Sequence, residues 1–582
     1  MMNVHFPVPR ALALTAALAF LALPLHADKV KVEVDGVRRE LKANILSVLT
    51  LQQENDGKLT EDRIRKLDAQ APDEIGVALQ PFGYYKPQVR SKLTQDGKTW
   101  TAHYDVDSGP PIKIATVDLQ ITGAGADEPA FREIAARFPV QQGNVLHHPD
   151  YERGKKALSD LAAEKGYLDA TFEENQVRVD LERYRADVVL HFVTGPRYLF
   201  GPVYFHQNVL EGRLLTGYIK FTPGEPLDVT KILELQNALS DSPYWSRVEV
   251  VTRQDRAENL EVPIDVNLVP AKTLRFSGGV GYGTDTGPRV KGTFDFRRLN
   301  SLGHRAQVQA SVSQIEQSLL TSYIIPGAYP RTDNLSYNLA YDRQITPTLE
   351  SKSGLVGAQY TQLRGNLTDT FALNFQRENY KVGLDNGTSN LLVPSAGLER
   401  VQADDRIYTT NGYRARFTLQ GTAKNPLSDA TFVQGLLDGK IIRTVGERNR
   451  LIGRTQIGYT ATNDFRILPP RFRFFAGGDQ SVRGYRYESL GTKDEAGNVI
   501  GGEALAVASL EYEYRFRPKW GVAVFYDTGG AFHNFGSGAL SQGAGFGIRW
   551  RSPIGPVRAD IACGLSDPRH PIVFHLNIGP DL

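Results

Sequence analysis

Alternation of apolar and polar residues runs through the C-terminal half of the chain. In residues 305–314 every second position is apolar, namely Ala306, Val308, Ala310 and Val312. A period of two places one class of side chain on each face of a β-strand. A membrane barrel with lipid outside and water inside requires this pattern, and a soluble sandwich shows it too. The pattern continues from residue 271 to residue 582, and roughly twenty residues per strand and connection predict about sixteen strands in an antiparallel barrel.

Composition narrows the class of protein further. The 582 residues are too many for one ordinary core, so several domains are expected. A net charge of +2 provides no general attraction to nucleic acid, and none is expected as a partner. The single Cys563 excludes an intramolecular disulfide. After residue 27 no run of apolar residues is long enough for a membrane helix, so any membrane crossing must use β-strands.

The first 27 residues have the features of a secretory signal. Arg10 precedes a small and apolar run over residues 11–23, no acidic residue comes before Asp28, and the small Ala27 ends the segment. This order of a basic, an apolar and a small-residue region predicts a cleaved signal peptide for residues 1–27. An uncleaved membrane anchor is the alternative, although the apolar run is short for a span.

A three-fold repeat fills residues 28–270. Each copy reads as a strand, two helices and two further strands, and the copies are residues 28–110, 111–196 and 197–270. An aromatic residue marks the same point in each copy: Tyr84, Tyr167 and Tyr244. A period of about eighty residues indicates an array of α+β domains, which is longer than any short solenoid repeat. The barrel is then predicted for residues 271–582.

One long connection interrupts the strand pattern of the barrel, over residues 468–502. It contains the sequence Val482, Arg483, Gly484 and Tyr485. Strand parity turns Glu511 and Asp527 towards the interior of the barrel, where a guanidinium can pair with both carboxylates. A connection of this length in a compact domain is either functional or disordered. The alternative for Arg483 is an exposed side chain on a surface loop.

The loop and the strands after it resemble the BamA/TamA superfamily of outer-membrane assembly barrels, and the whole chain resembles its TamA branch. In that superfamily a V-R-G-[FY] loop folds into the barrel lumen against an [FY]-x-D-x-G strand. The resemblance implies a latch in which residues 482–485 meet Glu511, Phe525, Asp527 and Gly529. The three repeats resemble POTRA domains. The resemblance to the superfamily also implies an outer-membrane location in a Gram-negative bacterium, with the POTRA domains in the periplasm.

The closure of the barrel provides a second candidate site. A barrel closes when its last strand pairs with its first, which here means residues 572–579 with residues 274–282. The first strand carries Leu274 and Phe276 together with Gly278, Gly279 and Gly281, and the last carries Phe574, Leu576, Ile578 and Gly579. Glycines weaken a strand and loosen its register, so a weak seam is expected. In the superfamily this seam is the lateral gate; glycines that serve only curvature are the alternative.

The resemblance also implies a function. It predicts a factor that inserts or secretes client proteins such as autotransporters, in contact with outer-membrane lipids and with a TamB-like protein anchored in the inner membrane. The POTRA domains would receive extended client chains at their strand edges, or act only as spacers. Two alternatives stay open: an exoprotein pore of the two-partner-secretion type, and a lipid-transport component that works with a TamB-like bridge.

Enzyme chemistry is not indicated. The chain lacks the motifs G-x-S-x-G, H-E-x-x-H and G-x-x-x-x-G-K-[ST]. His147 and His148 precede a helix, where capping and solvent exposure explain them. The series Gly543, Gly545 and Gly547 is interpreted as barrel patterning rather than as a phosphate loop. No catalytic residue, metal site or cofactor is predicted.

Overall fold

The structure is a computed structural model that describes residues 29–54, 59–97, 99–405, 407–553, 555–579 and 581. The signal peptide predicted for residues 1–27 lies outside these residues. The chain forms two compact units: the first holds the first two repeats, and the second holds most of the third repeat and the barrel. None of the described helices is both long and apolar enough to cross a membrane.

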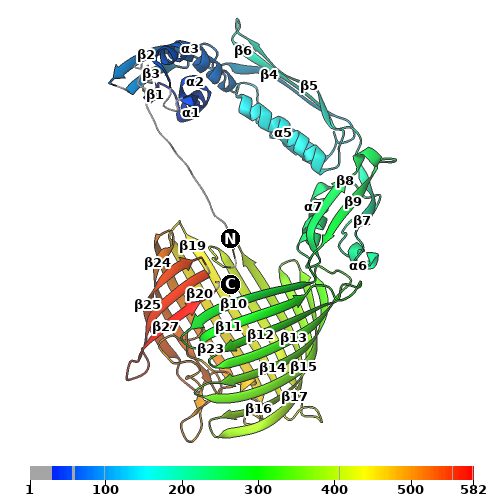
Figure 1. The fold of residues 1–582 in the computed structure, drawn as a ribbon, viewed down its shortest axis with the longest axis vertical. Coiled ribbons are helices and arrows are strands. Elements are labelled where there is room, and N and C mark those ends of the chain that lie inside the picture. Colours follow the sequence, from blue (N-terminus) through cyan, green and yellow to red (C-terminus); the bar gives the residue numbers. More distant parts are fainter. Residues whose placement is uncertain are drawn as a thin grey trace, which may run out of the picture. The chain divides into compact units, whose positions relative to one another are not determined.

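The first repeat packs helices on a three-stranded sheet of order β1-β3-β2 (Figure 1). Its elements are β1 (Lys29–Asp35), α1 (Arg39–Val48), α2 (Thr50–Gln53), α3 (Glu61–Leu79), β2 (Gln88–Asp96) and β3 (Thr99–Asp107). The helix α3 begins after Thr60, and the acidic Glu61 and Asp62 in its first turn favour that end electrostatically. Its apolar face packs on Trp100 and Tyr104 of β3 in a single core.

The second repeat has the same order of elements. They are β4 (Lys113–Thr122), α4 (Pro129–Ala136), α5 (His148–Glu164), β5 (Thr171–Asp180) and β6 (Arg185–Val193), with the sheet order β4-β6-β5. In β6 every second residue is buried, which matches the period of a strand with one covered face. Phe131 of α4 and Phe192 of β6 lie in its core, 6.2 Å apart between ring centroids.

The third repeat leads into the barrel. It consists of β7 (Leu199–His206), α6 (Gly212–Thr216), α7 (Val229–Ser240), β8 (Trp245–Thr252) and β9 (Glu261–Pro270), in the sheet order β7-β9-β8. Its loops contact the connection between the second and third barrel strands. The Tyr244 hydroxyl donates to the carbonyl of Gly303 at 2.5 Å, and the Glu211 amide donates to that of Ser301 at 2.9 Å. The predicted α+β repeats are therefore confirmed.

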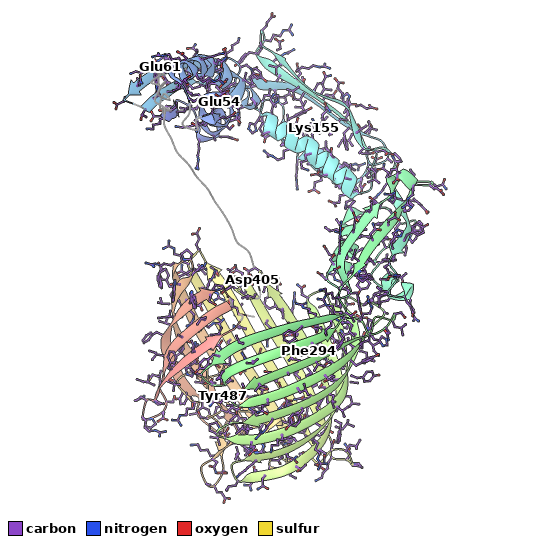
Figure 2. The ribbon with its side chains drawn as sticks, in the orientation of Figure 1. Glu54, Glu61, Lys155, Phe294, Asp405 and Tyr487 are labelled. Atoms are coloured by element: carbon purple, nitrogen blue, oxygen red, sulfur yellow. The ribbon has the colours of Figure 1, made fainter. Side chains whose placement is uncertain are left out.

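The C-terminal domain is a closed antiparallel barrel of sixteen strands, as predicted. The strands are β10 (Leu274–Gly283), β11 (Gly287–Phe296), β12 (Arg305–Ser313), β13 (Glu316–Pro326), β14 (Asp333–Ile345), β15 (Leu349–Arg364), β16 (Leu367–Val382), β17 (Asp385–Ala403), β18 (Gly412–Thr422), β19 (Phe432–Val445), β20 (Asn449–Thr462), β23 (Ala504–Arg517), β24 (Trp520–Phe532), β25 (Ser541–Ser552), β26 (Gly555–Gly564) and β27 (Ile572–Ile578). Phe294 of β11 is one of its many exposed apolar side chains (Figure 2).

The segment between β20 and β23 folds into the barrel interior. It contains the short strands β21 (Thr492–Lys493) and β22 (Val499–Gly501). Phe474, Ala476, Val482 and Tyr485 of this loop form a buried cluster with residues of β23 and β24. On β24 the alternation sorts the side chains by face, because Val524 is 55% exposed whereas Asp527 is fully buried. The loop therefore meets the polar, inward face of the wall.

Candidate lumen latch and barrel seam

Arg483 reaches the inner wall from the tip of the loop and is 5% exposed. Its Nε and Nη2 donate to the two oxygens of Asp527 at 2.7 and 3.0 Å, and its backbone amide donates to the same carboxylate at 3.0 Å. Two parallel hydrogen bonds between a guanidinium and a carboxylate fix both groups in one orientation. Arg483 is therefore clamped to β24 by its side chain and its backbone.

The same guanidinium contacts two further strands. Its Nη1 donates to Glu511 of β23 at 2.7 Å and to Asp560 of β26 at 3.1 Å. Its carbon Cζ lies 3.3 Å from the ring centroid of Phe525, so the cation also stacks on an aromatic face. One side chain of the loop thus joins three strands of the wall. Asp560 was not predicted from the sequence.

Arg549 of β25 is a second cation in this cluster, and it also was not predicted. It donates to Glu511 at 2.7 Å and to Asp560 at 2.5 Å, so both carboxylates lie between two guanidinium groups. The alternation of side chains along β25 is the sequence signal that could have identified Arg549. Phe546, Ile548 and Trp550 are exposed, which turns Arg549 inward. Alternation of charges lets each buried ion keep a partner, as a buried charge requires.

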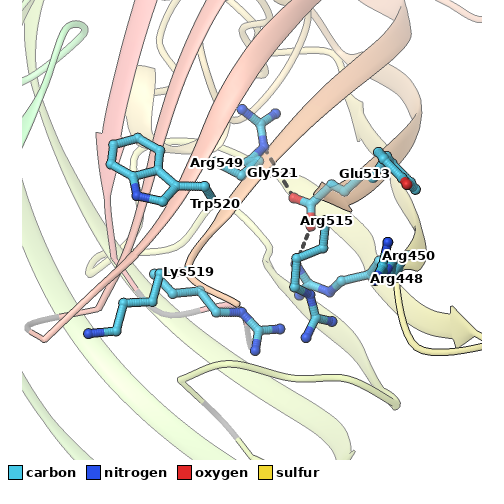
Figure 3. Close-up of a pocket in the computed structure, with 10 residues that line it drawn as sticks. Arg448, Arg450, Glu513, Arg515, Lys519, Trp520, Gly521 and Arg549 are labelled. Atoms are coloured by element: carbon cyan, nitrogen blue, oxygen red, sulfur yellow. Dashed lines mark hydrogen bonds and ion pairs between the residues drawn. The ribbon is translucent and has the colours of Figure 1, made fainter. Parts of the chain in front are cut away.

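The ion pairs continue towards the C-terminal end of the chain. Glu513 accepts from Arg549 at 3.1 Å and from Arg450 of β20 at 2.6 Å, and Figure 3 shows its carboxylate between these two residues. Arg450 also donates to Asp581 at 2.5 Å, and Arg558 pairs with the same carboxylate. The last strands are therefore held together inside the barrel by charge as well as by backbone pairing.

The remaining predicted latch residues lie around Arg483. Gly484 has a φ of +93°, and an added Cβ would stand 2.6 Å from the backbone of Cys563, so only glycine fits without strain. Tyr485 donates its hydroxyl to the carbonyl of Gln542 at 3.2 Å. Val482 has no exposed surface, and Gly529 lies on β24 against the backbone of Ala506.

The glycine series of β25 provides the space in which the latch lies. An added Cβ at Gly543 would stand 1.9 Å from the carbonyl oxygen of Arg483. At Gly545 it would stand 2.5 Å from the ring of Phe525, and at Gly547 1.8 Å from Asp560. The sequence interpretation of barrel patterning did not identify the contact of Gly543, because Arg483 comes from a distant loop, whereas Phe525 and Asp560 lie on the adjacent strands β24 and β26.

The seam between the first and last strands is almost unpaired. Among the described residues, β10 and β27 share one residue pair, Gly283 with Asn577. By contrast, β10 pairs with β11 along its whole length. The pair lies one residue beyond the predicted segment 274–282, and it joins the end of β10 to the end of β27. Most of the β10 edge therefore has no strand partner in the part of the chain that the structure describes.

The predicted seam residues lie on both sides of this opening. Leu274 and Phe276 are 49% and 63% exposed, and Phe574 is 53% exposed. An added Cβ at Gly279 would meet nothing within 4 Å. The other residues placed on the two strands or directly after them are Gly278, Gly281, Leu576, Ile578 and Gly579.

The loop also contacts both strands of the seam. The Asp479 amide donates to Asp285, in the turn after β10, at 2.6 Å, and Asn577 of β27 donates to the Asp479 side chain at 2.7 Å. Burial, together with the charge of Asp479, raises the pKa of Asp285 to about 7. His575 lies 3.9 Å away on β27. One loop residue thus bridges the two edges of the opening.

This contact predicts a pH dependence of stability. The pKa of Asp285 is near 7 when folded and about 3.9 when unfolded, so between these values only the folded chain binds the proton. Stability should therefore fall by about 3 kcal/mol from pH 4 to pH 7 and become nearly level above pH 7. In Asp285→Asn this slope should disappear. Thermal unfolding in detergent at pH 5 and pH 8 measures it.

Asp567→Asn is the control for this prediction. Asp567 lies in the loop between β26 and β27, and the hydrogen bond from Arg569 lowers its pKa, so it stays ionised over this range. Its variant should keep the slope of the wild type. An Asp285→Asn protein whose unfolding temperature still falls from pH 5 to pH 8 as much as that of the wild type contradicts the assignment.

Fold and site together define an outer-membrane assembly barrel: sixteen strands, a loop locked in the lumen, and three POTRA units before them. Residues 299–581 match the model of the Omp85 superfamily domain, and residues 31–108 match that of the POTRA domain TamA domain 1. The chain belongs to the Omp85 superfamily and carries a TamA-type first POTRA domain. It is an outer-membrane protein with periplasmic POTRA domains, and an assembly or translocation factor rather than an enzyme.

Two similar proteins carry the name BamA. The outer membrane protein assembly factor BamA of Nitratidesulfovibrio vulgaris is 23% identical over 572 residues, which cover 92% of this chain and 70% of that protein. The crystal structure of BamA from Haemophilus ducreyi lacking POTRA domains 1–3 has a TM-score of 0.67 at 17% identity. It covers 80% of this chain and 99% of the other, and this likeness concerns the fold.

Proposed function

We propose that the protein is a TamA-like subunit that inserts or secretes client proteins, autotransporters among them, through the seam between β10 and β27. The edge of β10 carries this proposal, because none of the described residues after β26 pairs as a strand with residues 274–282 on that side. An unpaired edge exposes a row of backbone donors and acceptors onto which another strand can add. A client strand that pairs there leaves the aqueous lumen towards lipid.

The latch has a supporting role in this proposal. Arg483 and Arg549 hold β23, β24, β25 and β26 together, so this side of the wall stays rigid. On the other side of the seam, the side chains of β10 form no comparable network with described residues. Opening of the barrel wall is then confined to the seam between β10 and β27. The latch therefore keeps the barrel ready for assembly and performs no chemistry itself.

The POTRA domains would receive client chains and bind the partner protein. In each sheet the last-but-one strand of the repeat, β2, β5 or β8, lies at one edge. Such edges accept an extended chain by backbone pairing. The TamA-type first domain supports a TamB-like, inner-membrane-anchored protein as the partner. The loop that packs against the inner wall opposes the alternative of an open conduit for one exoprotein.

A disulfide across the seam tests the proposal. Register partners on antiparallel strands lie about 4.5–5.5 Å apart between Cα atoms, which is within the range of a disulfide. The pair is Gly283→Cys with Asn577→Cys in a Cys563→Ser background. Oxidation should abolish the assembly of an autotransporter into vesicles that contain the protein, and reduction should restore it. Both single-cysteine proteins should remain active.

A second disulfide within the wall is the matched control. Thr293 and Gln309 are register partners on β11 and β12, and a bond between their cysteine variants leaves the seam free. It should not affect assembly. Full activity of the oxidised Gly283–Asn577 variant would move the function to the lumen or to the POTRA domains. Altered lipid distribution with intact protein assembly would favour the lipid-transport alternative.

A further inference from the structure

A polar cavity of about 380 Å³ lies between the third repeat and the first barrel strands. The residues after α7 form one side, and the starts of β10 and β12 and the end of β11 form the other. Six of its lining residues carry its polar chemistry: Asp241, Trp245, Arg275, Asp295, Arg297 and Arg305. The latch and the seam pair are elsewhere in the barrel, so the proposed gate does not account for these residues.

Two donors in this lining are buried and unsatisfied. Trp245 is 5% exposed, and its Nε1 has no hydrogen-bond partner among the described residues. The Nε of Arg305 is likewise buried without an acceptor. A buried donor without an acceptor is unfavourable, so native proteins rarely keep one without a ligand or water. Both residues line the cavity, and within the described part of the chain neither donor has an acceptor.

The charges of the lining are also incompletely paired. Within the described part of the chain, Arg275, Arg297 and Arg305 form no side-chain ion pair or hydrogen bond. Arg275 and Asp295 are register partners on β10 and β11, and Asp295 accepts a bond from Gln307 at 2.5 Å. Asp241 pairs with Arg331 at 3.9 Å. Three guanidinium groups without an ion pair and two carboxylates around one cavity complement a ligand that carries an anion and a cation.

The seam gives membrane lipid a path to this cavity. Arg275 lies on β10, and no described strand pairs with the seam edge of β10 over residues 274–282 or separates that edge from the bilayer. The apolar Leu274, Phe296 and Leu299 at the same strand ends are 49%, 37% and 47% exposed. These ends lie at the periplasmic side, where the barrel leaves the hydrocarbon and meets headgroups.

We propose that this cavity binds the headgroup of a zwitterionic aminophospholipid of the periplasmic leaflet. The phosphodiester accepts from Trp245 Nε1 and from the guanidinium groups of Arg275 and Arg305, since guanidinium and phosphate form strong paired hydrogen bonds. The ammonium group lies towards Asp241 and Asp295. Basic pockets at a membrane surface bind lipid headgroups by this chemistry. The bound lipid thereby sits beside the start of β10.

Binding of dihexanoyl phosphatidylethanolamine to the full-length protein in detergent tests this site, with native mass spectrometry as the readout. The wild type should bind it at least tenfold more tightly than Arg305→Gln does. Trp245→Phe keeps the ring and removes only the N–H, so it should weaken binding severalfold even if Arg305→Gln misfolds. Arg343→Gln is the control, because its buried Nε is also unpartnered but lies on β14, outside this lining.

Other probes separate the sources of the ligand. The phosphatidylcholine and phosphatidylglycerol of the same chain length should bind more weakly, since one has no ammonium N–H and the other no cation. Equal affinity for all three lipids, or for the lipid in wild type and Trp245→Phe, overturns the proposal. So does equally tight binding of soluble O-phosphoethanolamine, or displacement of the lipid by an acidic peptide. The gate assay is unaffected by these outcomes, so the two proposals fail separately.

Discussion

Replacement of Arg483 by alanine should destabilise the barrel by about 3–5 kcal/mol, because it leaves buried carboxylates without their cation. Asp527, Glu511 and Asp560 all lie within 3.1 Å of this guanidinium. Arg549 can compensate for Glu511 and Asp560 but does not contact Asp527. We expect a lower unfolding temperature in detergent and little folded protein in the outer membrane.

Two further variants test whether this loss of stability comes from the latch. Arg483→Lys keeps the charge but cannot reproduce the two parallel hydrogen bonds, so its stability should lie between those of alanine and wild type. Arg416→Ala removes a half-exposed pair with Glu399 on the barrel, which is worth at most about 1 kcal/mol. If Arg483→Ala unfolds no more readily than Arg416→Ala, the latch does not stabilise the barrel.

A methyl group at Gly543 should displace the loop from the wall. In Gly543→Ala the new Cβ would overlap the carbonyl of Arg483, which is backbone and cannot turn aside. Overpacking of this kind costs about 1–3 kcal/mol, and here it also separates Arg483 from Asp527. Trypsin should then cut the loop at Arg486 or Lys493 in the folded barrel, and the unfolding temperature should fall.

Gly354→Ala is the matched control on β15, where an added Cβ meets nothing within 4 Å. Its loop should stay resistant to trypsin. A Gly543→Ala protein with an equally resistant loop would show that the tip of the loop does not lie against β25. Double substitution with Arg483→Ala adds a further check, since two changes that break one contact should not add.

Local patterns predicted much of this protein. Period-two alternation requires no knowledge of distant residues, and it turned Glu511 and Asp527 inward on β23 and β24. The helices of the repeats were also predictable from local signals, such as Thr60 and the acidic residues that follow it at the start of α3. The contact of Arg483 with Asp527 came from a motif resemblance. It joins residues 44 positions apart, which alternation alone does not connect.

The parts that were not predicted depend on distance in sequence and on register. Asp560 lies 77 residues after Arg483, and no local feature distinguishes it from other inward carboxylates. Asp479 and Asp285 are 194 residues apart. The register of β10 against β27 depends on the stagger around the whole barrel, which a two-residue period leaves undetermined. The cavity beside Trp245 needs the docked third repeat.

The one residue pair that the described residues form at the seam sets an energy scale for opening a barrel that has no ATP to use. A few hydrogen bonds close the wall there, made by Thr284, Leu576 and the Asp479 side chain. At about 1 kcal/mol each they sum to a few times the thermal energy. At equilibrium the two strands would then be separated in about one molecule in a hundred to one in a thousand. A waiting client strand needs only to capture that fluctuation, so its own folding can supply the work.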